Sequence, residues 1–180
     1  SCVHTALIAA GVIGDPRTGF HELSQQWVGV TDWVFSASFN LDELHASHAI
    51  HELVLDGLDT TATIRINGTI AGQCSNVHHE HRFSIASLIR AGPNAIAICF
   101  AAPLCEIRTL EQELGARPVN GDWDPFIFMC KAAYNFGWDW GPKVATCGIW
   151  KHCRIESRST PRIRSVRPHL RLVDADRWQA

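Results

Sequence analysis

Residues 61–70 read Thr-Ala-Thr-Ile-Arg-Ile-Asn-Gly-Thr-Ile, and this segment combines two signals of an antiparallel hairpin. Its apolar residues Ala62, Ile64 and Ile66 alternate with polar ones, which is the period-two pattern of a strand with one buried face. Asn67-Gly68 follows at once, and this dipeptide favours the positive φ angles of a two-residue hairpin turn. The segment therefore predicts two antiparallel strands joined by a tight turn.

The same pattern recurs on both sides of this hairpin. Residues 33–40 alternate in the same way, and further short apolar segments follow between turns at residues 51–55, 83–85, 96–100 and 149–155. Short strands separated by frequent turns are typical of an antiparallel β-sandwich or jelly roll. We therefore predict a mainly all-β sandwich over residues 25–157. The side chains expected to face its core are Trp33, Phe35, Ile64, Ile66, Ile96 and Ile98.

Other segments depart from the strand pattern. Leu104, Ile107, Leu110 and Leu114 recur at spacings of three and four, which predicts one short helix ended by Gly115. A shorter helical stretch is expected near residues 5–10. Residues 116–148 are rich in Gly, Pro, Trp and Asp without periodicity, which predicts a long aromatic loop of functional importance. The Arg- and Pro-rich residues 158–171 are typical of a linker that leads to a new strand.

Composition restricts the class of protein. The chain has 180 residues, 46% of them hydrophobic and 19% charged, with a formal net charge of −2. It therefore lacks the basic field that attracts nucleic acid or an anionic membrane, and no apolar run has the roughly 20 residues of a membrane helix. Its seven cysteines are an odd number and show no Cys-x-x-Cys spacing. This argues against a disulfide framework or zinc ribbon, so we expect reduced thiols and a cytoplasmic protein.

The densest chemical signal is Phe-Gly-Trp-Asp-Trp-Gly-Pro at residues 136–142. A carboxylate such as Asp139 can accept hydrogen bonds from two adjacent sugar hydroxyls. The indoles of Trp138 and Trp140 can offer an apolar face to a sugar ring and donate an N–H. The alternative is a buried tryptophan cluster with Asp139 capping a turn, and the residues alone leave both interpretations open.

The segment from Lys131 to Pro142, followed by Gly148-Ile149-Trp150, is similar to the signature segment of the β-mannosidases of glycoside hydrolase family 2. The likeness extends from about Val3 to about Arg171, and the Trp-Asp-Trp-Gly-Pro run distinguishes β-mannosidases from their β-galactosidase and β-glucuronidase relatives. The chain departs from the usual family pattern at Ala6, where Asp is common, and at His21, where Asn is common. Other residues and stretches that carry the resemblance are 3–5, 10–13, 15–16, Gly19, Glu22, 26–28, 32–33, 57–60, Ala62 and 67–68.

The resemblance implies a galactose-binding-domain-like jelly roll over residues 1–157, followed at 158–180 by a linker and the start of an immunoglobulin-like domain. It also implies a (β/α)₈ barrel, outside this chain, that carries the two catalytic glutamates of a retaining hydrolase. No catalytic residue, cofactor or metal is therefore expected in this chain, and we expect it to be inactive alone. Trp138, Asp139 and Trp140 are expected to bind the terminal mannose. The expected partners are a β-mannoside oligosaccharide or glycoside and the remaining domains of the same enzyme.

Other functions remain open at this level. The chain could be a free-standing carbohydrate-binding module, a lobe of a β-galactosidase or β-glucuronidase relative, or a purely structural domain. The new strand after Pro161 favours the β-mannosidase lobe over the module, because a free module would close its sheet.

Three weaker motifs have simpler interpretations. His78-His79-Glu80-His81 resembles a metal cluster, but adjacent strand residues face opposite ways, so a solvated loop is the better prediction. Residues 122–125, Asp-Trp-Asp-Pro, offer two carboxylates for which a turn is the simpler role. Asn67-Gly68-Thr69 is formally a glycosylation acceptor that the hairpin turn explains.

Overall fold

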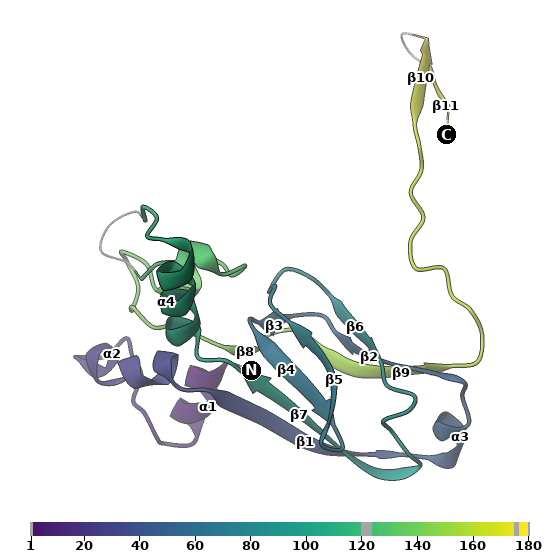
Figure 1. Cartoon of the computed structure of the whole chain (residues 1–180), viewed down its shortest axis with the longest axis horizontal. Helices are drawn as coiled ribbons and strands as arrows, with labels where there is room; N and C mark the ends of the chain where they lie inside the picture. The colour runs from purple at the N-terminus through teal and green to yellow at the C-terminus, as the bar shows by residue number, and fades with distance from the viewer. Residues whose placement is uncertain (1, 120–123, 175–176, 180) are drawn as a thin grey trace.

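The computed structural model describes residues 2–119, 124–174 and 177–179, and most of them form a β-sandwich (Figure 1). One sheet has four strands in the order β1-β7-β4-β5, and the other has three in the order β6-β2-β9. All strand pairs within these sheets are antiparallel, which confirms the predicted all-β class. The strands of the first sheet are β1 (Trp33–Leu41), β4 (Ala62–Ile66), β5 (Thr69–Cys74) and β7 (Gly92–Phe100). Those of the second are β2 (Ile50–Leu55), β6 (His81–Ser84) and β9 (Cys153–Arg158).

Alternating side chains of the two sheets meet in one hydrophobic core. Leu53 and Leu55 of β2 belong to the same buried cluster as Ile64, Ile66 and Ile98 from the opposite sheet. The three isoleucines were predicted to face the core, and this is confirmed. The other predicted core residues, Trp33, Phe35 and Ile96, are partly buried and pack against this cluster. Two of them lie on β1, which is an edge strand and so has a neighbouring strand on one side alone.

The predicted hairpin is present as β4 and β5. Ile66 pairs with Thr69 across the turn, and Asn67 and Gly68 have φ angles of 50° and 85°, as a type I′ turn requires. The Asn67 amide also accepts a hydrogen bond from the Ala95 N–H at 2.9 Å and donates one to the Leu88 carbonyl at 2.8 Å. These bonds give Asn67 a structural role at the hairpin tip.

The segment predicted as one closing strand is divided in two. β8 (Gly148–Ile149) pairs with β3 (Leu58–Asp59), and β9 then pairs with β2. Between β8 and β9, the backbone N–H of Trp150 donates a hydrogen bond to the Gly57 carbonyl at 3.3 Å. The chain thus leaves one strand partner for another at Trp150, an event that apolar periodicity does not reveal.

Helices collect mainly at one end of the sandwich (Figure 1). The predicted helix is α4 (Pro103–Leu114), followed by Gly115 with a φ of 83°. The shorter predicted stretch is α1 (Val3–Ala9). Further short helices are α2 (His21–Ser24), α3 (Glu43–Ala46), η1 (Gln26–Val30), η2 (Phe126–Phe128) and η3 (Ala133–Phe136). None of the helices in the described part of the chain is long and apolar enough to cross a membrane.

An extended segment leads from β9 away from the sandwich to β10 (Arg171–Asp174) and β11 (Arg177–Gln179) (Figure 1). These two strands form a sheet of their own. The division into a domain at 1–157 and the start of another at 158–180 stays a prediction.

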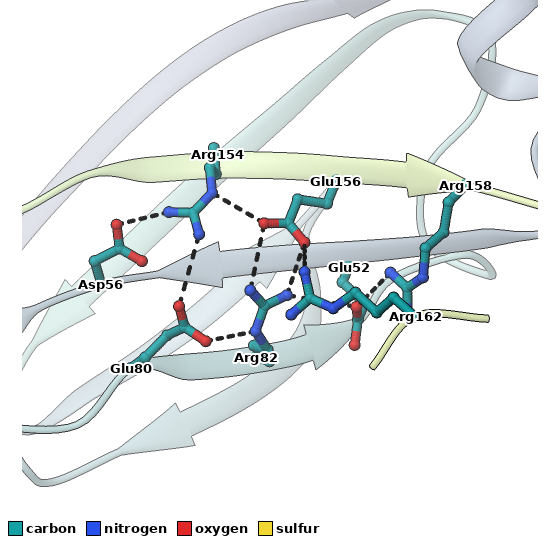
Figure 2. Close-up of polar contacts among 8 residues, drawn as sticks. All are labelled: Glu52, Asp56, Glu80, Arg82, Arg154, Glu156, Arg158 and Arg162. Carbon is teal, nitrogen blue, oxygen red and sulfur yellow. Dashed lines mark hydrogen bonds and ion pairs between the residues drawn. The ribbon is translucent and has the colours of Figure 1, made fainter. Parts of the chain in front are cut away.

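The outer face of the three-stranded sheet carries a network of charged side chains, the sheet-face network (Figure 2). On this face Glu52 lies beside Glu156, and Val54 lies between Arg82 and Arg154. Arg82 donates to Glu156 at 2.9 Å. The members of the network are Glu52, Asp56, Glu80, Arg82, Arg154, Glu156, Arg158 and Arg162.

Candidate functional site

The described part of the predicted long loop, here called the aromatic loop (residues 124–147), folds against α4. Phe136 and Ala145 of this loop are buried together with Leu104 and Ile107 of the helix. This second small core holds the aromatic loop in a fixed conformation. The apolar residues of the loop come from several short turns, so its sequence shows no regular hydrophobic period.

Trp138-Asp139-Trp140-Gly141 forms a tight turn within the aromatic loop. The Gly141 N–H donates to the Trp138 carbonyl at 3.1 Å, which leaves Asp139 and Trp140 at the two central positions. Trp138 and Trp140 are 45% and 82% exposed, and Asp139 is exposed as well. No hydrogen bond or ion pair joins the Asp139 carboxylate to another residue within 2–119, 124–174 or 177–179. The alternative interpretation of these residues, a buried tryptophan cluster with Asp139 capping a turn, therefore does not describe this segment.

A cavity of about 520 Å³, the first cavity, opens beside this turn. Its volume lies in the range of small-molecule sites. Trp138 and Trp140 belong to its walls, whereas Asp139 does not. The structure thus brings two of the three predicted site residues to one cavity and places the third at the exposed tip of the turn between them. The remaining lining residues are Tyr134, Asn135, Gly137, Gly141, Pro142, Val144 and Thr146.

A buried ion pair lies under the aromatic loop. The Lys131 ammonium is 2.7 Å from Asp59 Oδ1, and the two side chains are 0% and 9% exposed. The ammonium also donates to the Thr146 carbonyl and lies 5.4 Å from the centroid of the Phe136 ring. Burial lowers the pKa of Lys131, and the neighbouring Asp59 carboxylate opposes that shift.

Asp59 collects further hydrogen bonds from the loop. Its Oδ2 accepts from the Thr146 hydroxyl at 3.0 Å and from the Asn135 amide at 3.4 Å. Its Oδ1 also accepts from the Thr60 hydroxyl at 2.6 Å. One carboxylate of β3 therefore holds three positions of the aromatic loop, counting Lys131, against the edge of the sandwich.

A second attachment holds the loop on the other side of the turn. The Lys143 N–H donates to Glu22 Oε1 at 2.8 Å, and the Lys143 carbonyl accepts from the Gln26 amide at 2.6 Å. The segment that carries Trp138 to Pro142 is thus fixed at Lys131 before the turn and at Lys143 after it.

The residues that make these attachments were not predicted to belong to the site. Asp59, Glu22 and Gln26 lie in stretches that carry the family resemblance, but no local pattern indicates a partner 72 to 121 residues away. A lysine inside an otherwise aromatic and apolar segment was the one available signal, since a buried lysine requires a partner.

The weaker motifs have local explanations. Within the described residues no group of three or more His, Cys, Asp and Glu side chains could hold a metal ion. His81 is hydrogen-bonded to the Asn76 carbonyl, and Glu80 pairs with Arg82. Asp124 pairs with Arg108 at 3.4 Å, while Asp122 and Trp123 lie outside the described residues. All seven cysteines are free, and the cytoplasmic location stays a prediction.

The fold and the cavity define an antiparallel β-sandwich lobe of the galactose-binding-domain type, with an exposed aromatic turn at one end. The chain belongs to the galactose-binding domain-like family of glycosyl hydrolase 2, whose family model matches residues 1–151. This confirms the resemblance drawn from the signature segment.

Similar proteins are named β-mannosidases. The chain is 33% identical to β-mannosidase B of Aspergillus terreus and 30% identical to the β-mannosidase of Bos taurus, each over 87% of its length. The crystal structure of the β-D-mannosidase from Dictyoglomus thermophilum superposes on 87% of the chain with a TM-score of 0.83 and 32% identity. The chain spans 19% of the length of the Aspergillus and Dictyoglomus proteins and 18% of the bovine one.

Proposed function

We propose that this chain is the N-terminal lobe of a retaining exo-β-mannosidase and helps to bind the terminal mannose. Relatives named β-mannosidases in fungi, cattle and a bacterium support this assignment. Because the chain spans about a fifth of their length, hydrolysis belongs to the longer protein. The described residues contain no (β/α)₈ barrel, and no residue of this lobe is assigned a catalytic role.

The observation that carries the proposal is the turn at Trp138-Asp139-Trp140. Both indoles are exposed at a cavity, and the Asp139 carboxylate has no partner among the residues that the structure describes. A sugar presents hydroxyls at its edge and C–H groups on its faces, so rigid indoles beside an unpaired carboxylate match both features. The attachments at Lys131 and Lys143 preorganise the turn, which reduces the ordering penalty of binding.

In this proposal the two catalytic glutamates come from the barrel that the family resemblance implies. One acts as nucleophile and the other as acid and base, about 5–5.5 Å apart as retaining hydrolases require. Asp139 would hold the hydroxyls of the terminal sugar while the glutamates act at its anomeric carbon. Binding energy from groups remote from the reacting bond can lower the barrier when the contact strengthens in the transition state.

Replacing Asp139 in the longer enzyme tests this role. Charge-assisted hydrogen bonds are worth about 1.5–3 kcal/mol, so Asp139→Ala should lower kcat/KM for an aryl β-mannoside by about one to two orders of magnitude. The melting temperature should stay within about 2 °C of the parent, because the exposed carboxylate makes no bond within the described part of the lobe.

Glu113→Ala is a matched control, because Glu113 is an exposed carboxylate near the end of α4. It should change neither kcat/KM nor the melting temperature. An Asp139→Ala enzyme that is destabilised but fully active would contradict the sugar-binding role.

A further inference from the structure

A second cavity of about 300 Å³ lies next to the first. The two cavities share Tyr134, Asn135 and Thr146 as lining residues, so they lie on either side of the same part of the aromatic loop. The second cavity adds residues from four other parts of the chain, namely Cys2, Asp59, Val77 with His78, and Trp150. It is therefore a distinct hollow that shares part of its wall with the proposed mannose site.

Two exposed aromatic side chains line the second cavity. Trp150 is 52% exposed and Tyr134 is 67% exposed. Trp150 is held in place, because its indole edge lies so close to Gly57 that a Cβ there would approach the indole Nε1 to 2.4 Å. The Lys151 ammonium lies over the indole at 4.3 Å from the ring centroid. A tryptophan fixed in this way and still half exposed provides a rigid apolar surface for a ligand.

The polar lining of the cavity is neutral overall. Asp59 carries a negative charge, but the Lys131 ammonium balances it at 2.7 Å. The Asn135 side chain donates to Asp59 through its nitrogen, and its amide oxygen makes no hydrogen bond to the residues described. The His78 ring and the Tyr134 hydroxyl likewise have no partner in the described ranges. The cavity thus offers donors and acceptors without net charge.

Aromatic surfaces combined with uncharged hydrogen-bonding groups suit a neutral polyhydroxylated ring better than an ion. We propose that the second cavity binds a second sugar unit of the same β-mannoside, next to the terminal mannose in the first cavity. This inference rests on the proposed function and extends it, because it assigns Trp150 and His78 to the recognition of a disaccharide. The shared lining of the two cavities supports adjacent sugar units.

Sugar titrations of the 180-residue chain test the inference. Mannose and β-1,4-mannobiose are each added to ¹⁵N-labelled protein while the indole N–H signals of Trp138, Trp140 and Trp150 are followed by NMR. Mannose should shift the Trp138 and Trp140 signals, and mannobiose should shift that of Trp150 as well. Trp150→Ala should raise the Kd for mannobiose about tenfold, the size of one good aromatic contact, and leave that for mannose unchanged.

His78→Ala keeps the test decisive if Trp150→Ala unfolds, since His78 is exposed and its ring has no partner among the described side chains. It should raise the Kd for mannobiose about threefold. Trp140→Ala is the matched variant in the first cavity alone and should weaken both sugars.

An unchanged Kd for mannobiose in both second-cavity variants, with Trp140→Ala still weakening binding, overturns the second sugar position and leaves the proposed function standing. If neither sugar shifts Trp138 or Trp140, the second sugar position in this chain is overturned, whereas the proposed function is tested separately by Asp139→Ala in the longer enzyme.

Discussion

The lobe contains two ionic groupings that differ in their access to solvent, since the side chains of the first are at most 9% exposed, whereas those of the second range from 8% at Arg82 to 44% at Glu80. The pair of Lys131 and Asp59 lies buried beneath the aromatic loop. The sheet-face network spreads over the outer surface of β6, β2 and β9, with arginines and carboxylates alternating so that most members have more than one partner (Figure 2). The first grouping holds the proposed sugar site, whereas the second covers a face of the sandwich.

Their energetics should differ for the same reason. The more exposed pairs of the network, such as Arg162 with Glu156 (32% and 26% exposed), should each contribute about 0–1 kcal/mol, because water and salt replace much of the attraction. Loss of one member of a buried pair leaves an uncompensated charge in the interior, which costs about 3–5 kcal/mol. Redundant partners also protect the sheet-face network, since Glu156 binds Arg82, Arg154 and Arg162. Solvent access and redundancy, more than the number of ion pairs, decide which charge is indispensable.

Lys131→Met should have the largest effect. It leaves the Asp59 carboxylate buried without its cation, so we expect the free energy of unfolding to fall by about 3–5 kcal/mol. Chemical denaturation followed by tryptophan fluorescence measures this change. Lys151→Met, which alters an exposed lysine, should cost less than about 1 kcal/mol.

The double variant Lys131→Met with Asp59→Asn separates charge from packing. Removing both charges should recover a large part of the loss, because no bare carboxylate remains. If Lys131→Met alone changed stability by less than about 1 kcal/mol, the distinction between the two groupings would be wrong.

Glu156→Gln should have an intermediate effect. Hydrogen bonds from Arg82 and then Arg154 lower the pKa of Glu156 to about 2 from its ordinary value of 4.5. A carboxyl whose folded-state pKa is depressed stabilises the protein above its unfolded pKa, and that contribution is lost as the pH falls from about 4.5 toward about 2. The parent should therefore lose stability across this window more steeply than Glu156→Gln. Denaturation curves at several acidic pH values measure the slopes, and identical slopes would contradict this role of Glu156.

Arg162→Ala should have the smallest effect. Arg162 reaches back from the segment after β9 to Glu156 at 2.5 Å, but Glu156 keeps its other partners. We expect a change within about 0.5 kcal/mol at low ionic strength and none at 1 M NaCl, where the Debye length is about 3 Å. A loss above about 2 kcal/mol that persists in salt would show that the sheet-face network behaves like the buried pair.

Local patterns predicted the sandwich well. The alternation at Ala62, Ile64 and Ile66 and the turn at Asn67-Gly68 are properties of adjacent residues, so a short window of sequence contains them. The spacing of Leu104, Ile107 and Leu114 predicted α4 for the same reason. The family resemblance, carried by residues 131–142, was confirmed by the match of residues 1–151 to the family model.

Local sequence patterns could not predict the contacts that hold the candidate site in place. Lys131 meets Asp59 across 72 residues, and Glu22 meets Lys143 across 121. These contacts arise only when the sandwich brings the aromatic loop beside β3 and α2. The break at Trp150 has the same origin, because the partners of β8 and β9, which are β3 and β2, lie far away in the sequence.

The most direct test of the account is a crystal structure of the longer enzyme with mannose bound in its active site. We predict that the Asp139 carboxylate lies roughly 2.5–3.0 Å from a hydroxyl oxygen of the terminal sugar, which is the distance of a charge-assisted hydrogen bond. Trp138 or Trp140 should pack against the sugar. A structure in which the sugar is bound for catalysis while Asp139 and both indoles remain in solvent would contradict the role assigned to this lobe.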